Sequence, residues 1–174
     1  MGKTKIKDDE LLDLVNEKDE VIGTVYRKEA QKDPSKIYRI VSVTIFNKKG
    51  ETLIQQRSMN KSHPGSWENS ASGHVLAGEK PELSAKRELM EELGIKTGLI
   101  FYDKWFIVKP NKRKFMWMYC GIVEHLDIKF DRDEIANIRW IKPEDLGEFA
   151  KNNQWDLNGY SHKEIMQAKQ FLKI

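Results

Sequence analysis

Three glutamates at helical spacing are the side chains of this 174-residue sequence best suited to do chemistry. Glu88, Glu91 and Glu92 stand at positions i, i+3 and i+4, so on a helix they would be neighbours. Like charges at this spacing destabilise a helix. A divalent cation reverses that effect, because carboxylate oxygens are hard ligands of the kind that Mg²⁺ and Mn²⁺ prefer. The spacing therefore predicts a metal site on one helix face, and the alternative is an acidic face that is merely solvated.

Residues on either side predict the helix that would carry these glutamates. Pro81 suits the first turn, where a missing N–H is no loss, and Gly94 suits the left-handed position just past the end. At about 100° per residue, five apolar side chains fall in one arc: Leu83, Ala85, Leu89, Met90 and Leu93. We expect this arc to pack on a sheet while the glutamates occupy a separate arc.

The glutamates are part of a longer pattern over residues 73–95. Its fixed positions are, in order, Gly73, Glu79, Arg87, Glu88, Leu89, Glu91, Glu92, Gly94 and Ile95. This pattern resembles the Nudix box, the signature of hydrolases that act on diphosphate linkages. So many matching positions in the right order make a merely solvated acidic face a poor explanation.

The resemblance implies roles for the acidic residues in and around the box. Glu88 and Glu92 would be the main ligands of Mg²⁺ or Mn²⁺, with Glu91 and the backbone carbonyl of Ser72 as further ligands. Glu91 is favoured over Glu134 as the base that accepts a proton from the attacking water.

Three box residues are the expected catalytic ones: Glu91, Glu92 and Arg87. Arg87 precedes Glu91 by four residues and could hold it in place. Glu79, at the helix entrance, could reach Arg87 or the metal ions. Gly73 is the supporting residue at the start of the loop that leads into the helix.

A wider resemblance narrows the family to the subgroup that contains type I isopentenyl-diphosphate isomerases and related hydrolases. It covers residues 15–24 and 56–74 in addition to the box. The isomerases need a catalytic cysteine just before the box glycine, where this chain has Ser72, whose hydroxyl is a far weaker acid than a thiol. They also need two metal-binding histidines, at positions that match Gln31 and Tyr38 here.

The isomerases further need glutamates on the strand after the helix, and residues 101–123 contain none. These departures favour hydrolysis. We expect Mg²⁺- or Mn²⁺-dependent cleavage of a phosphoanhydride bond in a nucleoside diphosphate derivative or a related organic diphosphate. Isomerisation of isopentenyl diphosphate stays as one alternative. A non-catalytic nucleotide-binding sensor on the Nudix fold is the other, disfavoured because such modules usually lose box glutamates that this chain keeps.

Basic residues upstream of the box are the expected contacts of the small-molecule diphosphate substrate. By resemblance they are Arg57, Lys61 and Arg27, of which Arg57 is the best, because a guanidinium grips phosphate oxygens in a fork. Four basic residues within 109–114 could grip a distal phosphate or form a solvated turn. Trp67, next to the box, is expected in the core rather than as a stacking platform.

Runs of β-branched and aromatic residues between turn residues predict strands mixed with a few helices. The expected strands cover residues 38–47, 52–57, 99–108, 114–123 and 135–141. Ser161 and Glu164 form a capping-box pattern that opens a final helix. The expected fold class is α/β, a Nudix fold in which an α/β/α sandwich surrounds a mixed β-sheet. Residues 11–16 and 21–27 add an N-terminal β-hairpin extension.

Length and composition fit one globular domain over residues 1–174. A net charge of +3 is too small to argue for a nucleic-acid partner, and no apolar run approaches the ~20 residues that span a membrane. The single Cys120 excludes an internal disulfide and, with an N-terminus that lacks a signal peptide's apolar core, favours the cytoplasm. Oligomeric state stays open: the hairpin could pair with another chain, as in a homodimer, or with its own sheet.

Overall fold

A mixed β-sheet forms the centre of the computed structural model, which describes residues 9–124, 128–155 and 159–174. Its strands are β3 (Tyr38–Asn47), β4 (Thr52–Arg57), β5 (Trp67–Glu68), β6 (Ala71–His74), β7 (Ile100–Lys109), β8 (Lys112–Val123) and β9 (Ile135–Ile141). The order across the sheet is β5-β4-β3-β8-β7, with β6 beside β3 and β9 beside β4. β3 and β8 run parallel and the other pairs antiparallel, which confirms the predicted mixed sheet.

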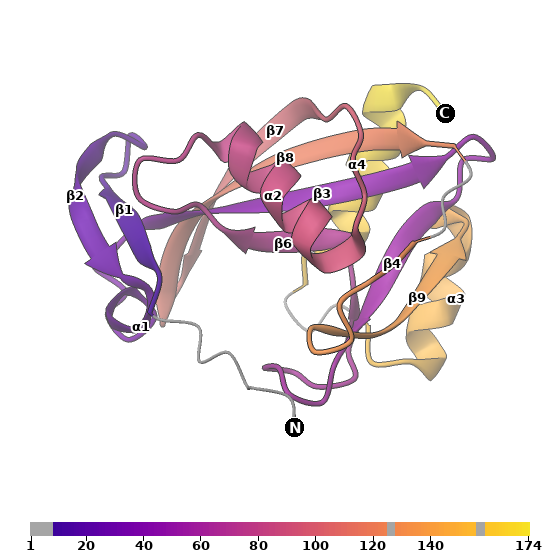
Figure 1. Ribbon diagram of the computed structural model, residues 1–174, viewed down its shortest axis with the longest axis horizontal. Helices are drawn as coiled ribbons and strands as arrows, with labels where there is room; N and C mark the ends of the chain where they lie inside the picture. The colour runs from indigo at the N-terminus through magenta and orange to yellow at the C-terminus, as the bar shows by residue number, and fades with distance from the viewer. Residues whose placement is uncertain (1–8, 125–127, 156–158) are drawn as a thin grey trace.

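Helices cover both faces of this sheet (Figure 1). α2 (Pro81–Leu93) lies across one face and α4 (Ser161–Leu172) across the other, so the predicted α/β/α sandwich is confirmed. α3 (Leu146–Asn152) follows a 3₁₀ turn at Pro143–Asp145 and lies beside β9. Within the described ranges, no helix is long and apolar enough to cross a membrane.

The core has two main parts because both faces of β3 are covered. Val43 of β3 packs with Leu89 of α2 in one cluster, and Phe46 packs with Ile165 of α4 in another. Trp67 belongs to the second cluster and is 7% exposed, which confirms its predicted place in the core. The sheet is therefore packed on both faces, against α2 on one side and α4 on the other.

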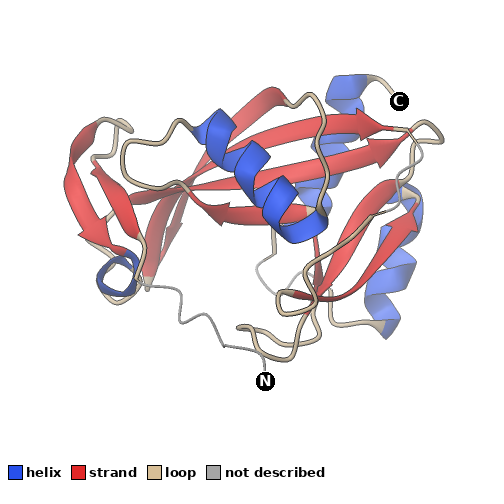
Figure 2. Cartoon of the chain, in the orientation of Figure 1, coloured by secondary structure: helices blue, strands red, loops and turns tan. Residues whose placement is uncertain are grey.

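The N-terminal extension is a separate two-stranded sheet, as predicted (Figure 2). β1 (Leu11–Val15) pairs antiparallel with β2 (Val21–Tyr26). Asp19, in the turn between them, accepts hydrogen bonds from Arg39 Nε at 2.6 Å and Lys104 Nζ at 2.8 Å. These bonds fasten the hairpin to β3 and β7 of its own chain.

Two local predictions from the sequence are wrong. The sequence predicts a strand up to Arg27, but Arg27–Ala30 form the short helix α1, because four residues are too few to show a helical period. The sequence also predicts a capping box at the start of α4, but Ser161 is already helical and no side chain caps this end. Glu164 turns inward instead, is 2% exposed and accepts a hydrogen bond from Asn69 Nδ2 at 2.9 Å. A buried tertiary hydrogen bond thus replaces the local cap.

Candidate active site

The carboxylate helix α2 has the predicted ends but a different packing face. It begins at Pro81 and closes at Gly94, whose φ of 63° is left-handed. Leu83 and Met90 are 53% and 55% exposed, so the prediction that they pack on the sheet is wrong. The helix instead buries a stripe with a period of about four residues: Ser84, Ala85, Glu88, Leu89, Glu92 and Leu93. Two of the box glutamates therefore lie within the packed interface and not on an outer face.

Glu92 is held in a buried and negatively charged position. It is 9% exposed and accepts a hydrogen bond from Gln55 Nε2 at 2.8 Å. Burial raises the pKa of Glu92 well above its ordinary value, and the negative charge of Glu88 raises it further, as do those of Glu68 and Glu134. The hydrogen bond from Gln55 acts in the opposite direction. A carboxyl in such surroundings is one whose charged form a nearby cation would stabilise.

Arg87 ties the box together through its guanidinium. Its Nη1 lies 2.6 Å from Glu88, and its Nη2 lies 3.0 Å from Glu79. Nη2 also donates to the carbonyl of His74 at 3.0 Å. The contact with Glu91 is looser, at 3.7 Å, and half of the Glu91 side chain is exposed. Arg87 therefore positions Glu88 and Glu79 more firmly than Glu91.

Gly73 leaves the space that the Glu88 carboxylate occupies. A Cβ on Gly73 would stand 2.0 Å from Glu88 Cδ and 2.2 Å from its Oε1. Ser72, the preceding residue, pairs with Ser42 of β3 and lines an adjacent recess. Position 73 therefore requires glycine, because β6 and the Glu88 side chain approach each other too closely to leave room for a Cβ.

The donor chemistry of this site fits a hard divalent cation. Among the residues that the structure describes, no three His, Cys, Asp or Glu side chains are already placed to hold an ion together. The charges of Glu88, Glu68 and Glu134 nevertheless all act on the buried Glu92 carboxyl, and every one of these donors is an oxygen. Oxygen-only donors suit Mg²⁺ or Mn²⁺. An ion bound at Glu88 and Glu92 would offset the negative charge gathered there.

Two of the three predicted substrate-binding cations lie at this carboxylate cluster. Arg57 Nη1 lies 2.6 Å from Glu68, and Lys61 forms an ion pair with Glu134. Arg27 instead pairs at 3.1 Å with a carboxylate just before β1, beside the N-terminal hairpin. Each of the three cations is therefore already paired with a carboxylate, and a substrate phosphate would have to share or displace that partner.

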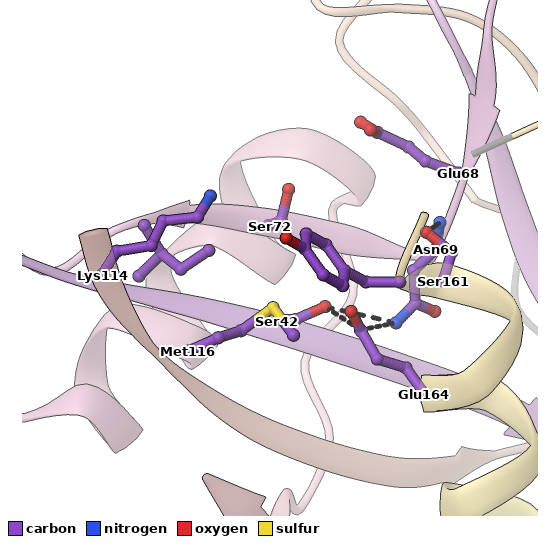
Figure 3. Close-up of a pocket in the computed structure, with 10 residues that line it drawn as sticks. Ser42, Glu68, Asn69, Ser72, Lys114, Met116, Ser161 and Glu164 are labelled. Carbon is purple, nitrogen blue, oxygen red and sulfur yellow. Dashed lines mark hydrogen bonds between the residues drawn. The ribbon is translucent and has the colours of Figure 1, made fainter. Parts of the chain in front are cut away.

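A small polar recess adjoins the carboxylates between the sheet and α4 (Figure 3). Its volume is about 70 Å³, and its polar lining comes from the sheet, the β5–β6 connection, and α4 with the residue before it: Ser42, Glu68, Asn69, Ser72, Lys114, Tyr160, Ser161 and Glu164. In its wall, Glu164 accepts hydrogen bonds from Ser42 Oγ and Asn69 Nδ2. Sequence reasoning missed these three residues because they lie too far apart to show a spacing. The one available signal was a hydroxyl residue, Ser42, within an otherwise apolar strand.

Comparisons with known proteins identify the family to which this chain belongs. The NUDIX domain family model matches residues 36–162, and the chain belongs to that family. An isopentenyl-diphosphate Delta-isomerase of Streptomyces coelicolor is 32% identical over 148 residues, which are 79% of this chain and 74% of that protein. An uncharacterised Nudix hydrolase of Pseudomonas aeruginosa is 33% identical over 157 residues, 87% of this chain and 90% of the relative.

A solved structure supports the same assignment. The crystal structure of DR0079 from Deinococcus radiodurans matches with a TM-score of 0.74 at 27% identity, and the match covers 91% of this chain and 99% of that one. The protein is therefore a hydrolase of the Nudix family with the Nudix fold. Family membership implies action on nucleoside diphosphate derivatives.

Replacing Glu92 with glutamine is expected to stabilise the metal-free protein at about pH 8. The folded pKa of Glu92 lies above its ordinary value of 4.5, so the carboxyl opposes folding as the pH rises past that value. Glutamine is neutral and can still accept the hydrogen bond from Gln55. We expect Tm to rise by about 2–4 °C, as for a gain of about 1 kcal/mol in a chain of this size.

Thermal unfolding with a chelator at about pH 8 and about pH 4 checks this expectation. Below both the ordinary and the raised pKa, Glu92 is protonated in the folded and the unfolded protein, so the gain should shrink at the lower pH. A Glu92→Gln variant that is less stable than wild type at about pH 8 would show that the ionised Glu92 carboxylate does not oppose folding.

Proposed function

We propose that the protein cleaves a phosphoanhydride bond in a nucleoside diphosphate derivative or a related organic diphosphate by attack of water, with Mg²⁺ or Mn²⁺ bound at Glu88 and Glu92. The observation that carries the proposal is the burial of these two glutamates on one helix among further negative charge. A polyanionic substrate would be repelled by such a cluster unless cations lay between them.

Separate residues of the site are proposed to bind the metal ions and to hold the metal ligands in position. Bound metal ions would engage phosphate oxygens, offset the charge of the transition state and acidify a bound water. Arg87 holds Glu88 in position, and Gln55 holds Glu92. The backbone carbonyl of Ser72, the residue before the glycine that contacts Glu88, is the proposed further ligand.

Glu91 is the proposed base that takes the proton from water. Its side chain is half exposed and lies only 3.7 Å from Arg87 without a closer bond, so it can meet a solvent molecule. Glu134 is engaged in an ion pair with Lys61, which makes it the weaker choice. Glu91, Glu92 and Arg87 are thus the proposed catalytic residues.

Supporting roles fall to residues around that centre. Glu79 accepts a hydrogen bond from Arg87 Nε at 3.1 Å and so fixes the guanidinium at the helix entrance. Arg57 and Lys61 stand beside the carboxylates and are proposed to receive substrate phosphate oxygens. Arg27 is the most distant of the three proposed cations, because it pairs beside the N-terminal hairpin.

We propose that the protein is located in the cytoplasm. Cys120 is buried, and burial raises the pKa of its thiol to about 11. A thiol in this state is poorly reactive, and its single presence in the sequence suits a reducing compartment.

Isomerisation of isopentenyl diphosphate is a second candidate, because a relative of this chain carries the isomerase name. Ser72 lines the recess at the position that resembles the site of the isomerase cysteine. A serine hydroxyl, however, is a far weaker acid than a thiol. Tyr38 stands next to His74, with ring centroids 5.7 Å apart, where the isomerases have a second histidine. The metal and proton donors of the isomerases are therefore replaced here, which favours hydrolysis.

A substrate panel with Mg²⁺ or Mn²⁺ tests the proposal. It should contain nucleoside triphosphates, ADP-ribose, nucleotide sugars, dinucleotides, coenzyme A and isopentenyl diphosphate. We expect release of a phosphate-bearing product from at least one compound, and no release in the presence of a chelator. Conversion of isopentenyl diphosphate to its isomer would overturn the proposal in favour of the second candidate. Tight binding of one compound without turnover of any would indicate a sensor.

A further inference from the structure

Lys114 differs from the other cations of the site in its surroundings. Arg57, Lys61 and Arg27 each form an ion pair with a carboxylate. Lys114 is half-buried, and among the residues that the structure describes its ammonium forms no hydrogen bond or ion pair. In Figure 3 the Lys114 side chain reaches into the recess on the side of Ser72. A lysine that points into a recess and forms no ion pair there can bind an anion that enters the recess.

Further positive charge lies near Lys114, outside the lining of the recess. Lys109 and Lys112 face each other across the β7–β8 turn. The pKa of Lys114 is lowered to about 8, mainly by burial and in smaller part by the positive charges of Lys112 and Lys109. The charges of Glu164 and Glu68 act in the opposite direction without a direct bond. An anion bound at Lys114 would relieve the repulsion that Lys112 and Lys109 exert on its ammonium.

The recess and the carboxylate site lie on opposite faces of β6. Ser72 lines the recess, and the next residue, Gly73, contacts the carboxylate of Glu88 on the other face. Glu68 lines the recess as well, and its charge acts on Glu92. Glu68 is therefore the link between the two sites, and a substrate with its diphosphate at the box glutamates would reach the recess past this residue.

We propose that the recess receives a second oxyanion of the substrate, a phosphate or carboxylate outside the bond that is cleaved, and that Lys114 binds it. A volume of about 70 Å³ holds on the order of five water molecules, which suits one such group. The opposite wall, where Glu164 accepts hydrogen bonds from Asn69 and Ser42, repels an anion and so directs it to the lysine. The inference rests on the proposed function, and it defines the substrate class as organic diphosphates that carry an additional anionic group.

Calorimetric titration of the metal-free protein with inorganic phosphate and with malonate tests the site without turnover. We expect the wild type to bind at least one of the two anions, and Lys114→Met to bind it at least about tenfold more weakly. Lys114→Arg keeps the charge and should stay within about threefold of the wild type. Lys151→Met removes an exposed lysine of α3 and serves as the control for net charge. Tighter binding of phosphate or of malonate identifies the group that the recess prefers.

Unchanged binding in Lys114→Met, equal loss in Lys151→Met, or no binding by the wild type up to about 20 mM would each overturn the inference. Glu92→Gln separates it from the proposed function, because this variant should lose turnover and still bind the anion. Hydrolysis with an unchanged KM in Lys114→Met would leave the proposed function standing and remove the recess from it. Lys114-dependent anion binding by a protein that hydrolyses nothing would remove the proposed function instead.

Discussion

Glu92→Gln is expected to lower turnover by at least about 10²-fold at saturating Mg²⁺. The substitution keeps the size of the side chain and its hydrogen bond from Gln55 Nε2, which is 2.8 Å long in the wild type. It removes the negative charge that a divalent cation needs at the centre of the carboxylate cluster. The measurement is steady-state kinetics on whichever substrate the panel identifies, with Mg²⁺ and Mn²⁺ titrated separately.

Glu82→Gln is the matched control for that experiment. Glu82 lies in the first turn of the same helix, is exposed and pairs with Lys86, away from the buried stripe. It should retain activity close to the wild-type value. Equal activity of Glu92→Gln and the wild type would remove Glu92 from the site, and an equal loss in Glu82→Gln would point to helix destabilisation.

Gly73→Ala is expected to lower turnover by about 10²-fold without a matching loss of stability. The new methyl group would stand 2.0 Å from Glu88 Cδ, so the carboxylate must move by at least an ångström. The Glu88 side chain can swing aside at low cost to folding, but a metal ligand displaced this far no longer supports catalysis. Turnover and Tm measured on the same preparation separate the two effects.

Gly147→Ala provides the comparison for this variant. Gly147 lies in α3, and a Cβ added there meets nothing within 4 Å, so alanine should leave activity unchanged. Normal activity in Gly73→Ala would mean that the position of Glu88 is not critical. A large fall in Tm would mean that the glycine is required for folding and not for the placement of a ligand.

The ends of the elements could be predicted from the sequence because their signals are local. Pro81 and Gly94 defined α2, and a run rich in β-branched and aromatic residues defined β3 with its limits at Tyr38 and Asn47. The presence of the glutamate trio was equally visible, since a helix fixes the relation of positions i, i+3 and i+4.

The placement of the side chains could not be predicted in the same way, because it depends on partners far away in the sequence. Leu83 and Met90 are apolar but exposed, since the sheet contacts the neighbouring stripe that contains Glu88 and Glu92. Glu164 matched a capping box, yet it bonds to Asn69, a partner 95 residues away. Tertiary hydrogen bonds of this kind produce no periodic pattern in the sequence.

Lys114 illustrates the same limit. The sequence places it in one basic run, residues 109–114, that is either a solvated turn or a phosphate contact. Strand alternation puts Lys114 and Met116 on the same face of β8, and both line the recess. The opposite face of β8 is buried as well, and the recess needs residues of α4, so the basic run alone does not single out Lys114.

A crystal soaked with Mn²⁺ tests the proposed metal site most directly, because the ion is located by its anomalous scattering. We expect a peak within bonding distance of carboxylate oxygens of both Glu88 and Glu92, and its loss in crystals of Glu92→Gln. A Mn²⁺ peak held by other residues, with the oxygens of Glu88 and Glu92 still turned to Arg87 and Gln55, would contradict the metal site on which the proposed hydrolysis depends.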